Sequence, residues 1–264
     1  MQFSKYHGAG NDFILIDGRQ HWPTAIDDYE FIAHLCHRRF GIGADGLIVL
    51  TNLEGCDFEM HYYNSDGRPS SMCGNGGRCI VAFASALGIN PASADGLYHF
   101  MAVDGLHRAK IAENGMVELE MQPVLDLEST EGDFILDTGS PHYVRLVGEV
   151  DEIKIIPEAH EVRYGKRFAA DGINVNFVEQ LSSGGLSIRT YERGVEDETY
   201  ACGTGVVAAS IVRASQLGPG KHHISVSAKG GELKVDLEWD GQQAKEIWLK
   251  GGAKKVFTGF LDIG

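Results

Sequence analysis

The chain repeats itself at one fixed spacing, and this repeat restricts its fold more than any other feature. Cys202 lies 129 positions after Cys73, and both residues open a Cys-Gly-x-Gly segment. The same offset of 129 relates three further pairs: residues 10–13 (GNDF) to 139–142 (GSPH), 43–45 (GAD) to 172–174 (GIN), and Tyr62 to Tyr191. One glycine match would mean little in a chain with 34 glycines, but four motifs at a single offset indicate a duplicated unit.

The hydrophobic pattern predicts many short strands and few helices in each half. We expect strands at residues 13–16, 47–50, 58–63, 97–103, 108–112, 116–121, 143–147, 174–180 and 186–191, with a hairpin around 229–232. Helices are expected at residues 27–39, 78–87 and 206–216. Two halves with this content predict an α+β fold.

Composition excludes several classes of partner. A length of 264 residues allows two medium domains, and a net charge of −14 disfavours nucleic acid or an anionic membrane as a partner. An anionic small substrate stays possible, because a site can be locally positive in an acidic protein. The N-terminal segment does not have the pattern of a signal peptide, and no apolar run reaches membrane-spanning length. Five irregularly spaced cysteines argue against a disulfide framework and favour a reducing, cytoplasmic location.

Cys73 and Cys202 are the strongest candidates for catalysis. A thiol at a helix N-terminus lies beside the positive end of the helix dipole and beside unpaired backbone N–H groups, which favour the thiolate. The same N–H groups can bind a carboxylate. Two such entrances could hold the α-carboxylate of an amino acid, with a thiol on each face of Cα. A lone cysteine is more often a small buried hydrophobe, but the matched pair favours proton transfer at a stereocentre.

The other cysteine and glycine motifs have simpler interpretations. Cys79 falls inside the apolar helical run and is expected to pack in the core, and Cys56 lies in a turn without evident role. The grouping of Cys36 with two histidines does not have a recognised ligand spacing, so we expect no metal and a partly exposed helix face there. Residues 41–46 fit G-x-G-x-x-G, but they follow a helix and precede a strand, which is the reverse of a dinucleotide-binding context.

Further polar residues occupy the matched segments of the two halves. His142 follows Pro141, while Glu192 and Arg193 follow a strand that ends at Tyr191. Such residues are usually ordinary surface groups, but their places in the repeat favour a shared site. The first half carries Asn11 and Asn64 in the corresponding segments. Arg193 could hold a carboxylate through its planar fork of donors.

These motifs resemble those of the diaminopimelate epimerase family over essentially the whole chain. The matching segments are residues 3–13, 63–67, 72–79, 141–142, 191–194 and 201–205. The resemblance implies an isomerase without a cofactor that interconverts LL- and meso-2,6-diaminopimelate in lysine and peptidoglycan precursor synthesis. It also implies two pseudo-symmetric domains, each a mixed, mostly antiparallel sheet wrapped around a central helix, with the site in the interdomain cleft.

The resemblance implies domain bounds, an assembly and site residues as well. The expected domains are residues 1–117 with 252–264, where the last strand returns to the first half, and residues 118–251; the expected assembly is a homodimer. The implied acid/base pair is Cys73 and Cys202, supported by His142 and Glu192. Substrate binding is implied for Asn11, Asn64, Gly74, Asn75, Asn174, Glu192, Arg193, Gly203 and Thr204, and no metal is implied.

Two departures and two alternatives accompany this interpretation. Many members have Asn at the position of Ser140, and some have Gln at that of Gly46, so recognition of the distal part of the substrate can differ. A proline or hydroxyproline racemase would use the same two-thiol logic, but it usually has His where this chain has Asn75. A non-catalytic amino-acid binder needs no matched thiols, and a thiol redox protein usually has local C-x-x-C spacing, which is absent here.

Overall fold

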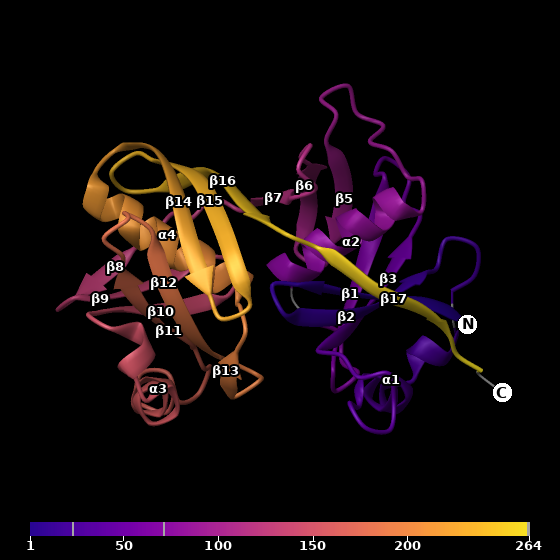
Figure 1. The fold of residues 1–264 in the computed structure, drawn as a ribbon, viewed down its shortest axis with the longest axis horizontal. Helices are drawn as coiled ribbons and strands as arrows, with labels where there is room; N and C mark the ends of the chain where they lie inside the picture. Colours follow the sequence, from indigo (N-terminus) through magenta and orange to yellow (C-terminus); the bar gives the residue numbers. More distant parts are fainter. Residues whose placement is uncertain (23, 71, 263–264) are drawn as a thin grey trace. The chain divides into compact units, whose positions relative to one another are not determined.

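A computed structural model of the protein describes residues 1–22, 24–70 and 72–262. The chain divides into two compact units, which are drawn in Figure 1. Unit 1 comprises Met1–Leu119 together with the C-terminal segment that begins at Gly252, and unit 2 comprises Glu120–Gly251.

Unit 1 consists mainly of strands. The strands are β1 (Gln2–Gly8), β2 (Asn11–Asp17), β3 (Gly46–Thr51), β4 (Phe58–Asn64), β5 (Tyr98–Ala102), β6 (Gly105–Ile111), β7 (Val117–Met121) and β17 (Lys254–Phe260). The helices are η1 (Thr24–Asp27), α1 (Tyr29–Cys36) and α2 (Gly74–Ala86). β7 runs across the unit boundary, and β17 pairs antiparallel with β1, so the end of the chain returns to the first half.

Unit 2 likewise consists mainly of strands. Its strands are β8 (Glu128–Thr130), β9 (Asp133–Asp137), β10 (Pro141–Val147), β11 (Asn174–Gln180), β12 (Leu186–Glu192), β13 (Asp197–Thr199), β14 (Gly220–Ala228), β15 (Gly231–Trp239) and β16 (Ala244–Gly251). Its helices are η2 (Val150–Glu152), α3 (Ile155–Arg163) and α4 (Gly203–Leu217).

Strand pairing follows one scheme in both units. In unit 1, β1–β2 is antiparallel, β2–β3 parallel, β3–β4 antiparallel, β4–β5 parallel, and β5–β6 and β6–β7 antiparallel. In unit 2, β9–β10 is antiparallel, β10–β11 parallel, β11–β12 antiparallel, β12–β14 parallel, and β14–β15 and β15–β16 antiparallel. The internal repeat predicted from the sequence is therefore confirmed, as is the mixed, mostly antiparallel α+β class.

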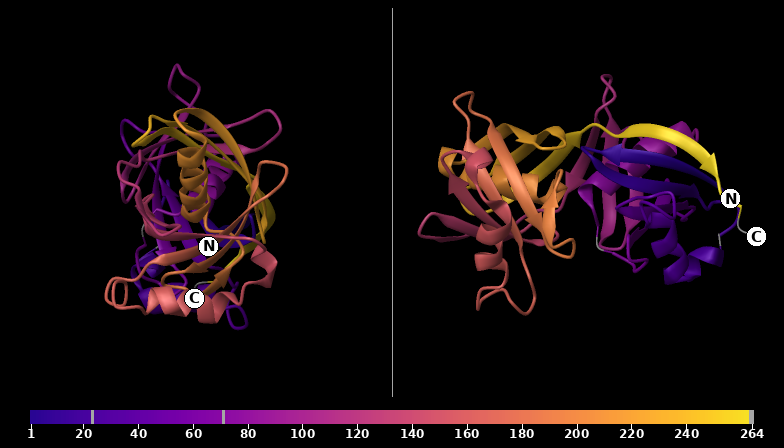
Figure 2. Two further views of the ribbon diagram at one scale, coloured as in Figure 1. Left: turned by 90° about the vertical axis from the view of Figure 1, so that its left-hand side faces the viewer. Right: turned by 60° about the horizontal axis from the view of Figure 1, so that its bottom comes forward.

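A helix lies against the inner face of the strands in each unit. Nearly every residue of the first two turns of α2 is buried, and α4 is buried around its circumference from Gly203 to Val212. A helix that is apolar on all sides must be covered on all sides. α2 contacts β1, β2, β3, β4, β6 and β17, whereas α4 contacts β9, β10, β11, β12, β14, β15 and β16. The left view of Figure 2 shows the orange helix α4 among the strands of unit 2.

Three helical features differ from the sequence prediction. α1 is shorter than the predicted residues 27–39, because Asp28 caps its N-terminus and the backbone at His37 is already extended. α2 and α4 begin earlier than expected, directly after the two cysteines. α3 was not predicted, although Ile155, Ala159 and Val162 form a buried helical face. Pro157 weakens the helical pattern in the sequence, but proline is tolerated in the first turn of a helix, where this residue lies.

Strand register places the ends of three strands together in each unit. Phe13 of β2 faces Gly46 of β3, and Gly46 faces Asn64 at the end of β4. In unit 2, His142 of β10 faces Asn174 of β11, while Val175 faces Tyr191 near the end of β12. The polar residues singled out in the sequence therefore gather at one edge of the strands in each unit.

Candidate active site

Cys73 and Cys202 occupy the same structural position in their units. Each is the N-cap residue of the central helix, with extended backbone angles φ −116°, ψ 118° at Cys73 and φ −103°, ψ 112° at Cys202. Each carbonyl accepts the first hydrogen bond of its helix, from the amide of Gly77 or of Val206. Neither side chain caps its helix, and both cysteines are free thiols. The first-turn N–H groups that follow have no acceptor within the helix and can bind an anion.

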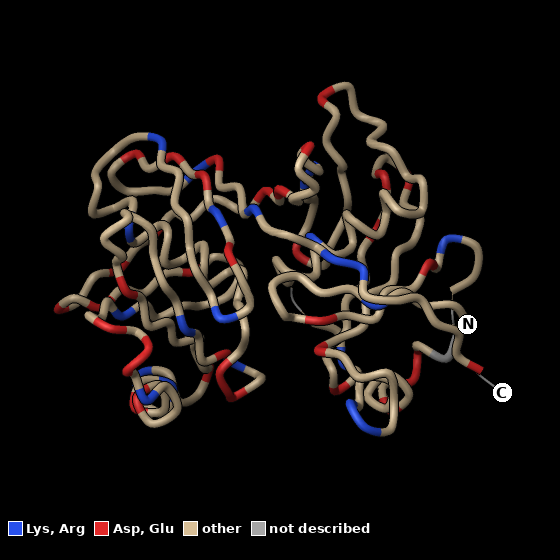
Figure 3. The backbone as a smooth tube through the Cα atoms, in the orientation of Figure 1, with Lys and Arg blue, Asp and Glu red and all other residues tan. Residues whose placement is uncertain are grey.

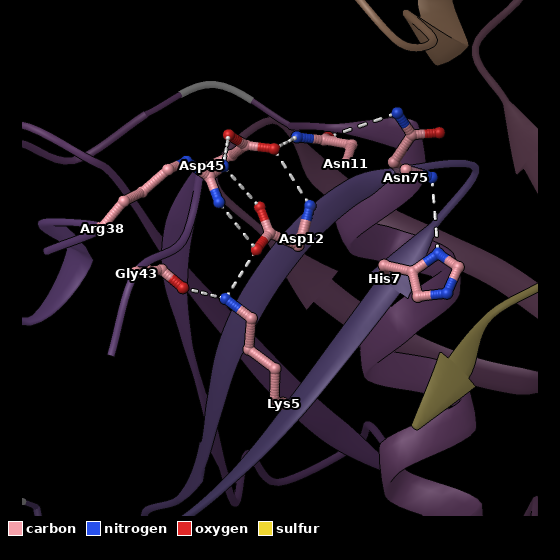
Figure 4. Close-up of polar contacts among 9 residues, drawn as sticks. Lys5, His7, Asn11, Asp12, Arg38, Gly43, Asp45 and Asn75 are labelled. Atoms are coloured by element: carbon pink, nitrogen blue, oxygen red, sulfur yellow. Dashed lines mark hydrogen bonds and ion pairs between the residues drawn. The ribbon is translucent and has the colours of Figure 1, made fainter. Parts of the chain in front are cut away.

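A hydrogen-bonded group of two asparagines and an aspartate adjoins Cys73 in unit 1. The Cys73 thiol donates to Oδ1 of Asn11 at 3.6 Å, and Nδ2 of Asn75 donates to the same oxygen at 3.2 Å; Figure 4 shows the bond between the two asparagines. On its other side, Nδ2 of Asn11 donates to Oδ2 of Asp45 at 2.6 Å. Asn75 is almost fully buried in the first turn of α2. Unit 1 thus brings Cys73, Asn11 and Asn75 together, as predicted.

A group of paired charges adjoins Asn11 and the start of β2. Asp12 forms ion pairs with Nζ of Lys5 at 2.7 Å and with Arg38 at 2.8 Å, and Arg38 also contacts Asp45 at 2.6 Å. Burial raises the pKa of Asp12, but the hydrogen bonds from Arg38 and Lys5 outweigh it and lower the pKa to about 2. Lys5 also donates to the carbonyl of Gly43. The start of β2, which carries Asn11, is therefore held by a group of paired charges.

Arg78, in the second turn of α2, has a fully buried guanidinium group. Its Nη2 donates to Oδ1 of Asn75 at 2.8 Å and its Nη1 to the carbonyl of Gly74 at 3.1 Å. Burial lowers the pKa of Arg78, while the thiols of Cys79 and Cys73, when ionised, act in the opposite direction. The charge of Arg78 is therefore coupled to that of Cys73.

A different hydrogen-bonded chain surrounds Cys202 in unit 2. Sγ of Cys202 lies 3.3 Å from Oγ1 of Thr204, and this hydroxyl lies 2.9 Å from Nε2 of His142. Nδ1 of His142 lies 3.1 Å from Nδ2 of Asn176, which also donates to the carbonyl of Tyr143. Burial, and secondarily the charge of Arg193, lower the pKa of His142 to about 3, so the imidazole is neutral near pH 7.

The direction of each bond in this chain follows from the neutral imidazole. A carbonyl only accepts, so the nitrogen of the Asn176 amide faces Tyr143 and also donates to Nδ1 of His142. The imidazole proton is then on Nε2, which donates to Thr204. The Thr204 hydroxyl is left with its own proton to donate to Cys202. His142 thus orients a donor toward the second thiol.

Asn174, Arg193 and Ser140 form a second group in unit 2. Nδ2 of Asn174 donates to Oγ of Ser140 and to the carbonyl of Pro141, both at 2.9 Å, and its Oδ1 accepts from the amide of Arg193 at 2.9 Å. Nη1 of Arg193 donates to the carbonyl of Asp171 at 3.1 Å and its Nη2 to Oγ of Ser140 at 3.5 Å, while the residue is exposed to solvent. Asn174 therefore fixes the segments that carry Ser140 and Arg193.

The remaining predicted residues lie near these groups. Glu192 ends β12 and pairs in register with Asp197, and Asn64 ends β4 with an exposed side chain. Gly74 and Gly203 are the first residues of α2 and α4. The roles of the predicted residues in binding and catalysis stay predictions.

Sequence reasoning missed three residues of these networks, which are Asp45, Arg78 and Asn176. Asp45 had a usable signal, because it occupies the position in the repeat that Asn174 occupies in unit 2. Asp45 holds Asn11 as Asn174 holds Ser140, so the repeat extends to the hydrogen bonding of the site. Arg78 and Asn176 lie within apolar runs and had no comparable signal.

The other cysteines do not take part in these networks. Cys79 is fully buried, which confirms the predicted packing role. The prediction of a partly exposed face around Cys36 is wrong for the cysteine itself, which is buried between exposed His34 and His37; burial raises the pKa of its thiol to about 12. Within residues 1–22, 24–70 and 72–262, no group of three or more His, Cys, Asp or Glu is placed to hold a metal. Residues 41–46 follow α1 and lead into β3, which confirms their unsuitable context for dinucleotide binding.

Charge and hydropathy give little further guidance. Asp and Glu outnumber Lys and Arg by 37 to 23, and charges of both signs are distributed along both units (Figure 3). In the part of the chain that the structure describes, none of the helices combines the length and apolarity needed to cross a membrane.

Comparison with known proteins gives a consistent result. The diaminopimelate epimerase family model matches residues 3–120 and 134–256. The diaminopimelate epimerase of Flavobacterium psychrophilum is 45% identical over 97% of this chain and 98% of its own length. That of Chlorobaculum tepidum is 41% identical over 97% and 99%, and that of Aquifex aeolicus 37% identical over 99% and 98%.

Solved structures support the same fold at low sequence identity. A Bacillus anthracis phenazine biosynthesis protein of the PhzF family has a TM-score of 0.73 at 13% identity, covering 100% of this chain and 99% of its own. A probable proline racemase from Agrobacterium radiobacter has a TM-score of 0.70 at 14% identity, covering 100% and 93%. A family match over residues 3–120 and 134–256 and relatives above one-third identity, together with the duplicated fold and the two cysteines at helix N-cap positions, place this chain in the diaminopimelate epimerase family of isomerases.

Proposed function

We propose that this protein interconverts LL- and meso-2,6-diaminopimelate, in the synthesis of lysine and peptidoglycan precursors. The observation that carries the proposal is the pair of free thiols at the N-caps of two matched helices. Near-full-length relatives that are named diaminopimelate epimerase support the choice of substrate.

The proposed chemistry is two-base proton transfer. The thiolate of one cysteine removes the α-proton, which breaks the C–H bond and leaves the electron pair on Cα. The thiol of the other cysteine then donates its proton to the opposite face and becomes the thiolate. No electron is gained or lost overall, so the proposed steps need no redox partner.

The developing negative charge needs stabilisation, because a thiolate is a modest base for an amino-acid α-proton. We propose that the α-carboxylate lies against the first-turn N–H groups of both helices, at Gly74, Asn75, Gly203 and Thr204. Donors already oriented in a site without water stabilise such charge without reorganising. We propose that a neutral His142 supports Cys202, because its hydrogen bond orients the Thr204 hydroxyl as a donor toward the sulfur.

Recognition of the distal amino acid is proposed for Asn11, Asn64, Asn174 and Arg193, whereas Glu192 is proposed to support the thiols and to bind substrate. The exposed guanidinium of Arg193 can donate two parallel hydrogen bonds to a carboxylate. Its backbone is held by Asn174, which also holds Ser140. Ser140 thus lies in this group although many family members have Asn there, so the serine can serve in place of the amide.

A homodimer and a cytoplasmic location complete the proposal. β17 pairs with β1 and exposes Val256, Phe257 and Phe260, an apolar surface that suits a second copy of the chain. The five cysteines are all free, which suits a reducing compartment.

A substrate panel tests the proposal. Purified protein is dialysed against a chelator and incubated with LL-diaminopimelate, meso-diaminopimelate, L-proline or trans-4-hydroxy-L-proline, and the products are separated on a chiral column. We expect conversion of the two diaminopimelate isomers to a common mixture and no conversion of the cyclic substrates. Conversion of proline or hydroxyproline alone would identify a racemase of the alternative class, and binding of diaminopimelate without conversion would identify a binder.

A further inference from the structure

Asp45 lies one residue before β3 and outside the predicted set of site residues, yet it contacts that set directly. Its Oδ2 accepts from Nδ2 of Asn11 at 2.6 Å and from the amide of Asp12 at 3.0 Å, while its Oδ1 accepts from Arg38 at 2.6 Å. Three donors therefore hold the carboxylate in place, and Figure 4 shows it between Arg38 and Asn11.

Two charged groups fix the orientation of the amides between them. A guanidinium only donates, so Arg78 selects the oxygen of Asn75 and leaves Nδ2 of Asn75 to donate to Asn11. A carboxylate only accepts, so Asp45 selects the nitrogen of Asn11. Both anchors require the same orientation of Asn11, with Oδ1 toward Asn75 and Cys73.

This orientation has a direct effect on Cys73. An oxygen that accepts from the thiol at 3.6 Å stabilises the protonated form of Cys73, whereas an amide nitrogen at the same place would stabilise the thiolate. The buried charge of Arg78 in α2 acts in the opposite sense and favours the thiolate. Further titratable groups near this start of α2 are Asp12 of β2, Lys5 and Tyr6 of β1, and the thiol of Cys79.

We propose that Asp45 is a positioning residue that acts on Cys73 through Asn11: by holding the Asn11 amide nitrogen, it keeps an acceptor oxygen against the thiol. In the proposed reaction, Cys73 acts as an acid in one direction and as a base in the other, so both its thiol and its thiolate must be accessible near neutral pH. The oxygen of Asn11 and the cation of Arg78 stabilise one state each. The catalytic consequence rests on the proposed function, but the effect on the Cys73 thiol does not.

Asp45→Asn and Asp45→Ala form a matched pair for the test. Asn at this position removes the charge but keeps an oxygen that can accept from Asn11, and Arg38 keeps its contacts with Asp12. Ala removes the charge and the acceptor together, so only the donor of Asn75 still holds the Asn11 amide, which can then turn its nitrogen toward sulfur. A pure charge effect would be equal in the two variants.

The primary readout is the pH dependence of alkylation of Cys73 by iodoacetamide, quantified by mass spectrometry of the peptide that contains Cys73, without any substrate. Circular dichroism checks folding, and Asp45→Ser, whose hydroxyl is too short to reach Asn11, replaces the alanine variant if that variant does not fold. Turnover with LL-diaminopimelate is measured in parallel.

We expect Asp45→Ala to lower the pH midpoint of Cys73 alkylation by about one unit relative to Asp45→Asn, as expected for loss of one hydrogen bond to the thiol and gain of one to the thiolate. Its turnover should fall at least about tenfold below that of Asp45→Asn, with most of the change in kcat. Equal midpoints in the two variants would overturn the proposal. If wild-type protein has no epimerase activity, the proposed function fails, but the alkylation midpoints still decide the role of Asp45.

Discussion

Replacing Gly205 with alanine tests whether the network around Cys202 is as closely packed as the structure indicates. Gly205 lies in the first turn of α4, and a Cβ there would overlap Oδ1 of Asn176 and lie 3.4 Å from Cε1 of His142. The repeat supplies a matched control in Gly76, which is 129 positions earlier in α2. A Cβ at Gly76 would meet the ends of two flexible side chains, Cδ1 of Ile48 at 3.1 Å and Cε of Met60 at 3.4 Å, and would lie in ordinary van der Waals contact with Cβ of Cys73 at 3.6 Å.

The two alanines should change the free energy of unfolding by different amounts. Each gains up to about 1 kcal/mol of helix propensity over glycine. At Gly205, the overlap requires Asn176 to move. Asn176 is fully buried, and its oxygen accepts from Thr190 at 2.9 Å. Overpacking costs about 1–3 kcal/mol, and an unsatisfied buried polar group costs about 1–3 kcal/mol. We therefore expect Gly205→Ala to be about 2–4 kcal/mol less stable than Gly76→Ala.

Urea unfolding and turnover with LL-diaminopimelate measure the two consequences. The shift of Asn176 should also release His142 and Thr204, so turnover of Gly205→Ala should fall at least about tenfold while Gly76→Ala stays within a few-fold of wild type. Equal unfolding midpoints and equal turnover for the two variants would refute the packing argument.

Three further predictions follow from the same networks. Cys73→Ala and Cys202→Ala should each lower turnover by about 10²–10⁴-fold without unfolding the protein; near-normal turnover of either variant in a coupled assay would contradict the two-base proposal. Oxidation should join Cys73 to Cys202 and abolish activity until a thiol reductant is added, and mass mapping of the inactive protein that found both thiols free would exclude this. His142, with its pKa lowered to about 3, should make the protein less stable in acid. The unfolded state takes up its proton below about pH 6.5 but the folded state does not, so stability should fall by about 1.4 kcal/mol per pH unit on acidification. Between pH 7 and pH 5 the urea-measured loss should be about 2 kcal/mol smaller in His142→Gln, and an equal loss would show that His142 is not buried and neutral.

The sequence predicted the parts of this fold that depend on periodic pattern. The offset of 129 between Cys73 and Cys202 led to the duplicated topology, and apolar alternation located most of the strands that flank the central helices. The sequence pattern predicts a start of α2 at Arg78, because glycines weaken the helical pattern before it, yet the helix begins at Gly74. At a helix entrance, tertiary packing overrides the low propensity of glycine.

Only those site residues that belong to the repeated motifs could be predicted from the sequence. Residues within the matched segments, such as Asn11 and Thr204, do contact the cysteines of their own units. Asp45, Arg78 and Asn176 contact other side chains of the site. Contacts between residues that are distant in the sequence produce no periodic pattern in it. The orientation of an amide, which decides whether a donor or an acceptor faces a thiol, depends on those distant anchors and could not be inferred from sequence.

Solvent deuterium incorporation tests the central claim most directly. LL-diaminopimelate is incubated in deuterated water with chelator-dialysed protein, without any added cofactor, and the α-proton signal is followed by NMR. We predict loss of the Cα–H signal together with the appearance of meso product that carries deuterium at the inverted carbon. No exchange under these conditions, or exchange that appears only after addition of pyridoxal phosphate or a metal ion, would contradict proton transfer by the two thiols.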